Sequence, residues 1–559
     1  MAYTPPVTEQ RFVLEHVARI GDLTQADTAT IDAIIDGLAE ITAGEVVPMG
    51  PVGDRERAQW TPTGVRMPEG YKAVYRALTQ GGWTSLAAPE AFGGQALPRL
   101  MMTVLLEDLG SADMGFSLVV MLSQGAVEAL TAHGTPEQQA AWLPKLVSGE
   151  WTGTMNLTEP QAGSDVGALR STAERQPDGR YRIKGQKIFI TFGEHDLTDN
   201  IVHLVLARTP DAPPGSKGIS LFLVPRYRAD GSANDVRCAS IEHKMGIHAS
   251  PTCVMLYGEK DDCIGEIIGH EGGGLNAMFT MMNAARLNVG LEGVSVAEAA
   301  TQAAVAYAQD RVQSPRSGSP SRASVAIIEH PDVRRILLRM KALTMASRAL
   351  VYAAVAAGDA SNQPRMDLLT PLAKSWATDV GCQVASLGVQ VHGGMGYIEE
   401  TGVARFYRDA RIAPIYEGTN GIQAADLVNR KLGLGGGAVL ATLLDEIRTD
   451  ANGHAGLLAL VEDVAAVVAG LASAAIDDRL AGSQALLDML AVAVAGGLMA
   501  RQATIAATAA GDPDFLAMKR AAAGYFLDVV VAEARGLRAA AEAGAEMLYA
   551  VSDRQFMAL

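Results

Sequence analysis

Apolar residues recur every three or four positions over most of the chain, beginning near Glu9. Residues with this spacing lie on one face of an α-helix. The spacing dominates as far as Glu150, so we predict an all-α domain over 1–153. Gly and Pro are predicted to interrupt the helices at 49–53, and a buried, strongly apolar helix is predicted over 101–109.

From Trp151 the pattern changes to short runs of β-branched and aromatic residues that are separated by Pro, Gly and Asp. Such runs are typical of strands joined by tight turns. We therefore predict an antiparallel β domain over 154–266. Its expected strands lie at 181–183, 187–191, 201–207 and 219–224.

Helical spacing returns after Gly274 and predicts a third domain over 267–433. A loop over 314–322, rich in Ser, Pro and Arg, is expected to lie in solvent. Glycines 435–437 predict a flexible joint, and the remainder of 434–559 is an Ala-rich, acidic helical extension. The fold class is therefore α+β. The long helices expected in the third domain lie at 277–312, 330–357 and 368–391.

The composition narrows the possible function classes. The chain has 559 residues, of which 48% are hydrophobic and 19% charged, and its net charge is -16. Its isoelectric point is near 5.1. This acidity opposes nucleic-acid binding, which requires clustered Lys and Arg. The four cysteines form no C-x-x-C pair, so we expect no metal site and a reducing compartment.

We also expect no targeting or membrane segment. The first residues lack the basic and then apolar order of a signal peptide. The longest apolar run, 490–500, is far shorter than a bilayer span. The sequence therefore favours a cytoplasmic protein that contacts no membrane.

Two short segments suit a planar cofactor. In L-T-E-P-Q-A-G-S-D, which begins at Leu157, hydroxyl residues beside glycine expose donors that suit flavin oxygens or a phosphate. Two ordinary turns would have the same residues. In K-I-F-I-T, which begins at Lys187, Phe189 and Thr191 share one strand face and can contact a planar ring. An ordinary strand is the commoner source of this second pattern.

Two further segments lie in the third predicted domain. Q-V-H-G-G-M-G-Y, from Gln390, has glycines that let the backbone approach a diphosphate or adenine closely. It lacks the strand-then-helix setting of a Rossmann fingerprint, and we interpret His392 as structural. Y-E-G-T-N-G-I-Q, from Tyr416, follows R-D-A-R-I and places Glu417 beside a glycine. Glu417 is our candidate catalytic base.

Taken in order, these segments resemble the acyl-CoA dehydrogenase family from roughly Phe12 to Lys431. The shared features are T-E-P…G-S-D, K-x-F-I-T, Arg311 at the end of a long helix, Q-V-H-G-G-M-G-Y, R-D-A-R-I and Y-E-G-T-N-G-I-Q. H-P-D-V-R-R, from His330, and E-H-D-L-T-D-N-I, from Glu194, resemble the longer bacterial members with a C-terminal helical extension. Those members include 3-(methylthio)propanoyl-CoA dehydrogenases and broad-range fatty acyl-CoA dehydrogenases.

The resemblance implies the family fold, in which an α domain, a β-barrel-like domain and an α-helical bundle hold FAD. An extra helical domain follows here. One departure is Gln313, which stands where many relatives carry an aromatic residue, beside a loop that is longer than usual. The resemblance places Leu157, Thr158, Gly163, Ser164, Phe189, Thr191 and Thr419 at the flavin and pyrophosphate, and Arg311, Gln390, Gly393 and Gly394 at the adenosine half bound by a neighbouring subunit.

The implied reaction is α,β-dehydrogenation of an acyl-CoA thioester. Glu417 removes the α proton while the β hydrogen leaves as hydride to the flavin. Some relatives place the base immediately before an arginine that corresponds to Arg286, but Ala285 stands there in this chain. No competing carboxylate therefore occupies that position. The residues expected to contact the substrate are Ser164, Arg286, Tyr416 and Gly418.

The expected substrate is a short- or medium-chain acyl-CoA, with 3-(methylthio)propanoyl-CoA among the candidates. Electron-transfer flavoprotein is the expected acceptor, in fatty acid β-oxidation, and the chain is expected to form a homodimer or homotetramer. An acyl-CoA oxidase that uses oxygen would need the same residues. A DNA-associated flavoprotein of this fold is a further alternative, which the acidic extension opposes. The extension itself is expected to cover a surface used for assembly in shorter relatives.

Overall fold

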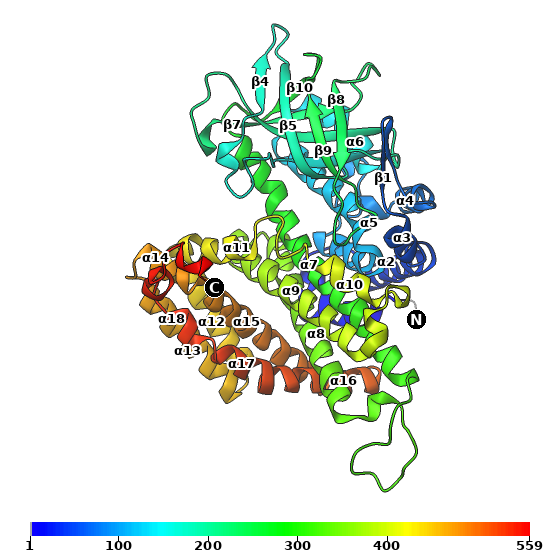
Figure 1. Ribbon diagram of the computed structural model, residues 1–559, viewed down its shortest axis with the longest axis vertical. Coiled ribbons are helices and arrows are strands. Elements are labelled where there is room, and N and C mark those ends of the chain that lie inside the picture. Colours follow the sequence, from blue (N-terminus) through cyan, green and yellow to red (C-terminus); the bar gives the residue numbers. More distant parts are fainter. Residues whose placement is uncertain (1–2, 559) are drawn as a thin grey trace. The chain divides into compact units, whose positions relative to one another are not determined.

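The computed structural model describes residues 3–558, which form two compact units. The sheet unit comprises residues 3–5 and Thr28–Asn288, and the bundle unit comprises Pro6–Asp27 and 289–558. The boundary falls within the long helix α7 (Gly274–Asp310) (Figure 1). The sheet unit contains most of the predicted domains 1–153 and 154–266. The bundle unit contains most of the predicted third domain and the extension.

The helices of the sheet unit are built around α5 (Arg99–His133), whose side chains are almost all buried. It contacts α2 (Thr28–Ile41), α3 (Met49–Glu56) and α6 (Pro136–Val147). The predicted helix over 101–109 is confirmed as part of α5. At α6, Thr135 and Gln138 form a capping box, which satisfies backbone N–H groups that have no partner within the helix.

Helix α5 is kinked at Asp113, whose φ of -154° and ψ of 97° are not helical. The Asp113 carboxylate accepts a hydrogen bond from the Phe116 N–H at 3.1 Å. It also accepts one from the hydroxyl of Tyr71, the first residue of α4 (Tyr71–Gln80). Asp113 therefore caps the second half of α5 from within the helix.

Two local predictions for this region are wrong. The predicted break at 49–53 is the start of α3. Pro51 lies in its first turn, where a backbone N–H would have no intrahelical partner, so proline is tolerated there. The region is also not entirely helical, because β1 (Gln59–Thr61) and β2 (Gly64–Arg66) form an antiparallel hairpin.

The four predicted runs become β5, β6 and β7 of one eight-stranded sheet, whose order is β10-β7-β6-β4-β5-β9-β8 with β3 paired to β6. The other five strands of the sheet were not predicted. Because β10 also pairs with β5, part of the sheet closes into a barrel-like ring. The pairing differs from the predicted antiparallel arrangement where β3 runs parallel to β6 and at one parallel pair between β4 and β6. The strands are β3 (Trp151–Asn156), β4 (Thr172–Arg175), β5 (Tyr181–Thr191), β6 (Asn200–Arg208), β7 (Ile219–Pro225), β8 (Val236–Ile241), β9 (Thr252–Tyr257) and β10 (Ile264–Ile268).

The three long predicted helices are confirmed as α7, α8 (Pro331–Asp359) and α9 (Gln363–His392). Glycines allow α7 and α9 to cross very closely. A Cβ atom on Gly293 would lie 2.1 Å from the backbone oxygen of Ala377, and one on Gly290 would lie 2.8 Å from that of Ala373. A side chain at either position would therefore force the two helices apart.

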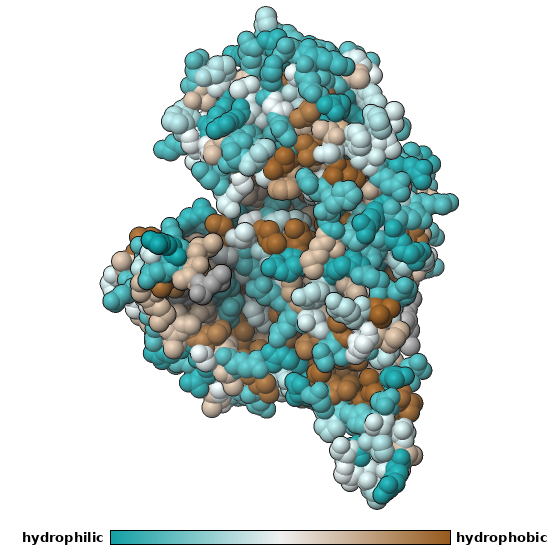
Figure 2. Space-filling model, in the orientation of Figure 1, coloured by the Kyte–Doolittle hydropathy of each residue, from teal (hydrophilic) through white to brown (hydrophobic). Residues whose placement is uncertain are grey.

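The predicted loop 314–322 is exposed along its whole length. It projects from the bundle unit in Figure 1, and its surface in Figure 2 is mostly polar or neutral. The bundle unit also contains α1 (Val7–His16), α10 (Val403–Ala410) and α11 (Asn420–Asp426).

The extension belongs to the core of the bundle unit. Its central helix α15 (Ser483–Ala506) is mostly buried and contacts α8, α9 and α11. Gly435, Gly436 and Gly437 all have positive φ, so the predicted joint is a turn that favours glycine at three successive positions. The remaining helices are α12 (Ala438–Asp450), α13 (Ala455–Leu471), α14 (Ile476–Ala481), α16 (Pro513–Tyr525), α17 (Val531–Arg535), α18 (Arg538–Glu542) and α19 (Glu546–Tyr549).

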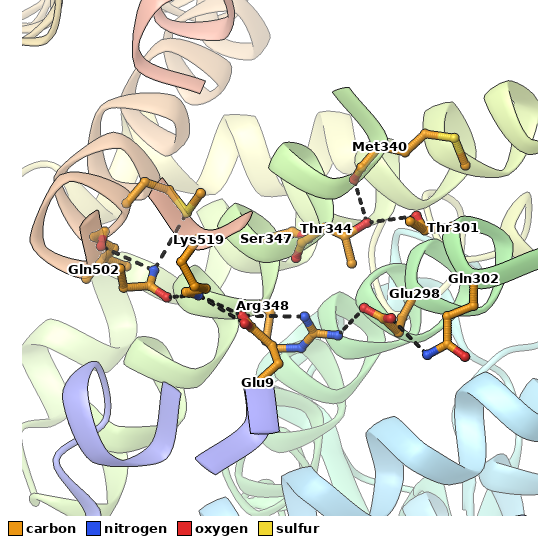
Figure 3. Close-up of polar contacts among 12 residues, drawn as sticks. Glu9, Glu298, Thr301, Gln302, Met340, Thr344, Ser347, Arg348, Gln502 and Lys519 are labelled. Carbon is orange, nitrogen blue, oxygen red and sulfur yellow. Dashed lines mark hydrogen bonds and ion pairs between the residues drawn. The ribbon is translucent and has the colours of Figure 1, made fainter. Parts of the chain in front are cut away.

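A buried polar network connects the extension to α1, α7 and α8 (Figure 3). Lys519 of α16 donates hydrogen bonds to Glu9 of α1 at 2.9 Å and to Gln502 of α15 at 2.5 Å. Arg348 of α8 lies beside Glu9 and pairs with Glu298 of α7 at 2.8 Å. Apolar contacts among Phe12, Ala506 and Leu516 accompany the network. The extension therefore completes the core around the first helix.

Two described helices, α5 and α15, are long and apolar enough to cross a membrane by length and composition. In each, 83% of the most apolar window is buried in the protein. Core helices of globular proteins satisfy the same two criteria. The apolar stretch of α15 is therefore longer than the run 490–500 found in the sequence, and the expectation that no segment reaches the length of a membrane span is not met by α15.

We predict that Lys519→Ala strongly destabilises the bundle unit. The substitution leaves the buried Glu9 carboxylate without its ammonium partner, and such a loss costs about 3–5 kcal/mol. Thermal unfolding followed by circular dichroism should show a clearly lower midpoint. The matched control is Arg335→Ala, which removes an exposed pair with Asp332 and should cost less than about 1 kcal/mol. Equal midpoints for the two variants would contradict the assigned role of the network.

Candidate active site

In the sheet unit, the structure brings the turn that begins at Leu157 against strand β5. The Ile188 N–H donates to the Thr158 carbonyl at 2.9 Å, and the Lys187 ammonium donates to the Leu157 carbonyl at 3.0 Å. Gly163 and Ser164 lie exposed on the same turn. The first two predicted segments therefore lie side by side.

Strand β5 carries a β-bulge between Lys187 and Ile190, where the predicted runs 181–183 and 187–191 join into one strand. Phe189 has φ of 60° and is 57% exposed, while Thr191 is half-buried. Ile190, between them, is buried. The bulge and the positive φ of Phe189 interrupt the regular alternation on which the predicted shared face was based, while both side chains remain at least partly accessible. An exposed aromatic ring beside a hydroxyl and an exposed glycine turn fits a planar, hydrogen-bonding ring.

A buried ion pair holds this turn to the strand. The Lys187 ammonium lies 2.8 Å from Glu159, and both side chains are almost completely buried. Glu159 also accepts hydrogen bonds from the backbone N–H groups of Arg170 at 2.6 Å and Ser171 at 3.0 Å. Burial by itself would raise the pKa of Glu159, but the Lys187 ammonium and these donors lower that pKa to about 2. Glu159 is therefore ionised at neutral pH and fixes the turn.

In the bundle unit, the candidate base lies in an unusual backbone conformation. Glu417 has φ of 55°, in the left-handed region, and Gly418 follows with φ of 89°. A non-glycine residue in this region costs roughly 1–2 kcal/mol, and such residues concentrate at functional sites. Gln423 donates weak hydrogen bonds to the carbonyls of Glu417 and Gly418 at 3.4 and 3.5 Å. Thr419 caps α11 by accepting from the Ile422 N–H at 3.3 Å.

Two buried contacts hold the residues on either side of Glu417. Before it, the Tyr416 hydroxyl donates to Glu292 of α7. After it, the Asn420 side chain accepts from Lys374 at 3.0 Å and donates to the Ser375 carbonyl at 3.2 Å, both on α9. The loop that carries Glu417 is therefore fixed at both ends.

Burial raises the pKa of Glu292 to about 8. The nearby Glu417 charge acts in the same direction, while Tyr416 and Lys374 act against it. Burial also raises the pKa of Tyr416 well above its usual range, and Glu292 adds to that shift. At neutral pH the pair is therefore mainly a phenol and a carboxylic acid without charge.

The remaining predicted cofactor residues lie at the ends of α7 and α9 in the bundle unit. Arg311, Gln390, Gly393 and Gly394 are all exposed. Among the described residues, none has a heavy atom within 4 Å of a Cβ built on Gly393 or Gly394, so this backbone is accessible. Arg311 donates to the side chain of Gln313 at 3.2 Å.

His392 and Arg286 differ in role. His392 is buried, stacks on Tyr307 with ring centroids 4.3 Å apart, and contacts the Gly388 carbonyl through Nδ1 at 2.8 Å, which agrees with its structural interpretation. Arg286 is buried on the sheet-unit part of α7 and lies 3.5 Å from the Asn283 side chain.

Four residues of the candidate site are not identifiable from the sequence alone: Glu159, Lys187, Glu292 and Asn420. Glu159 and Lys187 lie within the recognised motifs, but only their pairing in the structure explains why the motifs occur together. Glu292 did carry a signal. It is a lone acid between Gly290 and Gly293 in a strongly apolar helix, and a buried acid in such a setting needs an explanation.

A cavity of about 810 Å³ lies elsewhere in the sheet unit. Its lining includes Lys72, Glu194 and Arg226 and none of the predicted site residues. Within residues 3–558, no three His, Cys, Asp or Glu side chains are grouped so as to hold a metal ion.

Comparison with known families matches nearly the whole chain. Residues 30–150 match the N-terminal domain of acyl-CoA dehydrogenases, 154–258 the middle domain and 272–432 the C-terminal domain. Residues 441–552 match a domain described as acetyl-CoA dehydrogenase C-terminal like. The extension therefore has its own counterpart among these proteins.

Two similar proteins extend over almost the full length. The chain is 44% identical to 3-methylmercaptopropionyl-CoA dehydrogenase of Ruegeria pomeroyi, over 95% of this chain and 97% of that protein. It is 32% identical to a broad-specificity linear acyl-CoA dehydrogenase of Mycobacterium tuberculosis, over 91% of both. Among solved structures, an acyl-CoA dehydrogenase of Bacillus anthracis complexed with FAD has the same fold, with a TM-score of 0.75, 22% identity, and coverage of 95% of this chain and 91% of that one.

We predict that Glu159→Gln weakens the sheet unit most near neutral pH. The folded pKa of about 2 lies below the usual 4.5. The carboxylate therefore contributes about 3 kcal/mol above pH 4.5, which is lost as the pH falls from 4.5 towards 2. Urea unfolding at pH 7 and at successively lower pH should show the gap between wild type and variant closing. The control Glu259→Gln removes an exposed pair with Arg237 and should cost less than about 1 kcal/mol. A gap that stays constant with pH would contradict the assignment.

Proposed function

Because the chain belongs to the acyl-CoA dehydrogenase family, we propose that it converts a short- or medium-chain acyl-CoA to the trans-2-enoyl-CoA with Glu417 as base. The observation that carries the base assignment is the left-handed backbone of Glu417, fixed between two buried contacts. A structure retains such strain where a side chain must be presented in one orientation.

The protein is a flavoprotein that uses FAD. When bound, FAD accepts the hydride that leaves the β carbon of the substrate. We assign its flavin and pyrophosphate contacts to the turn from Leu157 to Ser164, to Phe189 and Thr191, and to Thr419. The exposed ring of Phe189 and the exposed glycine turn support this assignment.

We assign the adenosine half of FAD to Arg311, Gln390, Gly393 and Gly394 from a second copy of the chain. All four are exposed and polar or glycine, which suits contact with a ligand held by another subunit. The chain would then act as a homodimer or homotetramer, in which each copy completes its neighbour's cofactor site.

The chemistry proposed for Glu417 is removal of the α proton. That proton is a weak acid, so the developing enolate oxygen needs hydrogen-bond donors, among which we place the Glu417 backbone N–H. Closure of the site over the substrate removes water, which makes a carboxylate a stronger base near neutral pH. Ser164, Arg286, Tyr416 and Gly418 are the residues that we expect to line the substrate.

The substrate proposal rests on the relatives. The protein of Ruegeria pomeroyi is named for 3-methylmercaptopropionyl-CoA, and that of Mycobacterium tuberculosis for linear acyl-CoA substrates. We therefore include 3-(methylthio)propanoyl-CoA with the short and medium linear thioesters. We place the reaction in cytoplasmic fatty acid β-oxidation.

We predict that Glu417→Gln retains FAD but loses flavin reduction. Glutamine keeps the size of the side chain and cannot accept the α proton, so the rate should fall at least about 100-fold. The measurement is anaerobic bleaching of the flavin absorbance with linear acyl-CoA thioesters of increasing length and with 3-(methylthio)propanoyl-CoA. Bleaching at the wild-type rate by the variant would overturn the base assignment.

Electron-transfer flavoprotein is the proposed electron acceptor, since both full-length relatives are named as dehydrogenases. In air, without that acceptor, enoyl-CoA formation should stop after about one equivalent per bound flavin, because the reduced flavin of a dehydrogenase does not pass its electrons efficiently to oxygen. Adding electron-transfer flavoprotein should restore turnover. Continued turnover in its absence, with one hydrogen peroxide formed per enoyl-CoA, would instead identify an acyl-CoA oxidase.

A further inference from the structure

The buried acid Glu292 has no part in the reaction as proposed so far. Its side chain lies on α7 and is 5% exposed. Oε2 accepts the hydrogen bond from the Tyr416 hydroxyl, whereas no described residue hydrogen bonds to Oε1. We propose that Glu292 is a positioning residue that orients Glu417 through Tyr416 and tunes its strength as a base. This inference rests on the proposed role of Glu417.

The packing of α7 on α9 fixes Glu292 in place. Gly290 and Gly293 lie on either side of it in the sequence, and both approach the backbone of α9 closely. The helix therefore cannot shift to take Glu292 away from Tyr416 without losing this crossing. A carboxyl group held by two closely packed helices is a rigid anchor for the loop.

The loop connects the Glu292 contact to Glu417. Tyr416 directly precedes Glu417, and the Asn420 N–H closes the loop by donating to the Pro414 carbonyl at 3.0 Å. The anchor on Asn420 is on α9, so the loop is held by both helices that form the glycine crossing. Loss of the Tyr416 contact should therefore let one end of the loop move while the other stays fixed.

The charges around Glu292 explain how it tunes the base. Tyr416 and Glu417 face it from the loop and Lys374 from α9. Asp409 of α10 acts on Tyr416. Asp379 of α9 faces Lys374 and Asn420. Only Lys374 among these groups carries a positive charge, and it also binds Asn420.

The burial of Glu292 determines whether the rate of flavin reduction rises or falls with pH. Burial raises the pKa of Glu292 to about 8, so the group is neutral at pH 7 and ionises above pH 8. The new negative charge repels that of Glu417 and strengthens it as a base. As the α proton transfers, negative charge leaves Glu417 and the repulsion is relieved. The rate of flavin reduction should therefore rise about threefold or more across pH 8.

The test is single-turnover flavin bleaching of the holoenzyme at saturating acyl-CoA from pH 6 to pH 9.5. Wild type should show the rise near pH 8. Glu292→Gln can still accept from Tyr416 but cannot ionise, so its profile should lack that rise. Asp488→Asn is the matched control. Asp488 is half-buried, its pKa is raised to about 7 by burial, and it contacts Gln484 rather than Tyr416. This control should keep the rise.

The positioning role is tested by removing the contact from either side. Glu292→Leu and Tyr416→Phe should each lower the rate at pH 7 about 10-fold or more, with the half-saturating substrate concentration changed less than threefold. If Glu292→Leu does not fold, Tyr416→Phe decides the question. Persistence of the rise in Glu292→Gln, or wild-type rates in Tyr416→Phe, would overturn the inference.

Glu417→Gln in the same assay separates this inference from the proposed function. If that variant bleaches flavin at the wild-type rate, the base assignment itself fails. If it is inactive while the Glu292 and Tyr416 variants behave as wild type, Glu417 remains the base and only the role of Glu292 is rejected.

Discussion

The proposed chemistry depends on one constraint, the fixed left-handed backbone at Glu417. A short loop closed between Pro414 and Asn420 would ordinarily relax such a residue into a more stable conformation. Here Tyr416 is bound to Glu292, and Asn420 is bound to Lys374 and Ser375. The free energy of these buried contacts opposes relaxation and fixes the direction of the carboxylate.

The glycine crossing and the extension both support this constraint. Gly290 and Gly293 let α7 approach α9 closely enough for Glu292 and Lys374 to act on the same loop. On the other side of α9, Gln484 of α15 lies 3.4 Å from the Ser375 hydroxyl, and α15 also contacts α11. The extension therefore packs against the elements that hold the base. The sequence predicted only that the extension covers a surface used for assembly in shorter relatives. Its packing connects it more closely to the candidate site than that.

Much of this architecture is predictable from the sequence, because local periodicity determines where helices and strands form. The long helices, the strands β5, β6 and β7 and the exposed loop at 314–322 follow from spacing and turn residues. The parallel pairing of β3 and the presence of Pro51 in the first turn of α3 do not, since the first depends on a distant strand and the second on position within a helix.

Some residues of the candidate site can likewise be identified from the sequence, and others only from the structure. Glu417 and the exposed turn can be recognised as motifs, whereas the bulge at Phe189 and the pairing of Glu159 with Lys187 require the folded strand. Glu292 is a stronger case. Its sequence context shows that an acid is buried, but only the fold shows that its partner is the residue before the base.

Two glutamates on α7 show why burial alone does not decide the role of an acid. Glu298 is buried, yet Lys341 and Arg348 overcome the effect of burial and lower its pKa to about 2. Glu292, six residues earlier, has a phenol as its hydrogen-bond partner, and burial raises its pKa to about 8. The negative charge of Glu298 is balanced by these two cations, and Glu298 stabilises the core. Glu292 keeps a proton that it can lose near physiological pH, and a group in that state can respond to the charge of a neighbouring base.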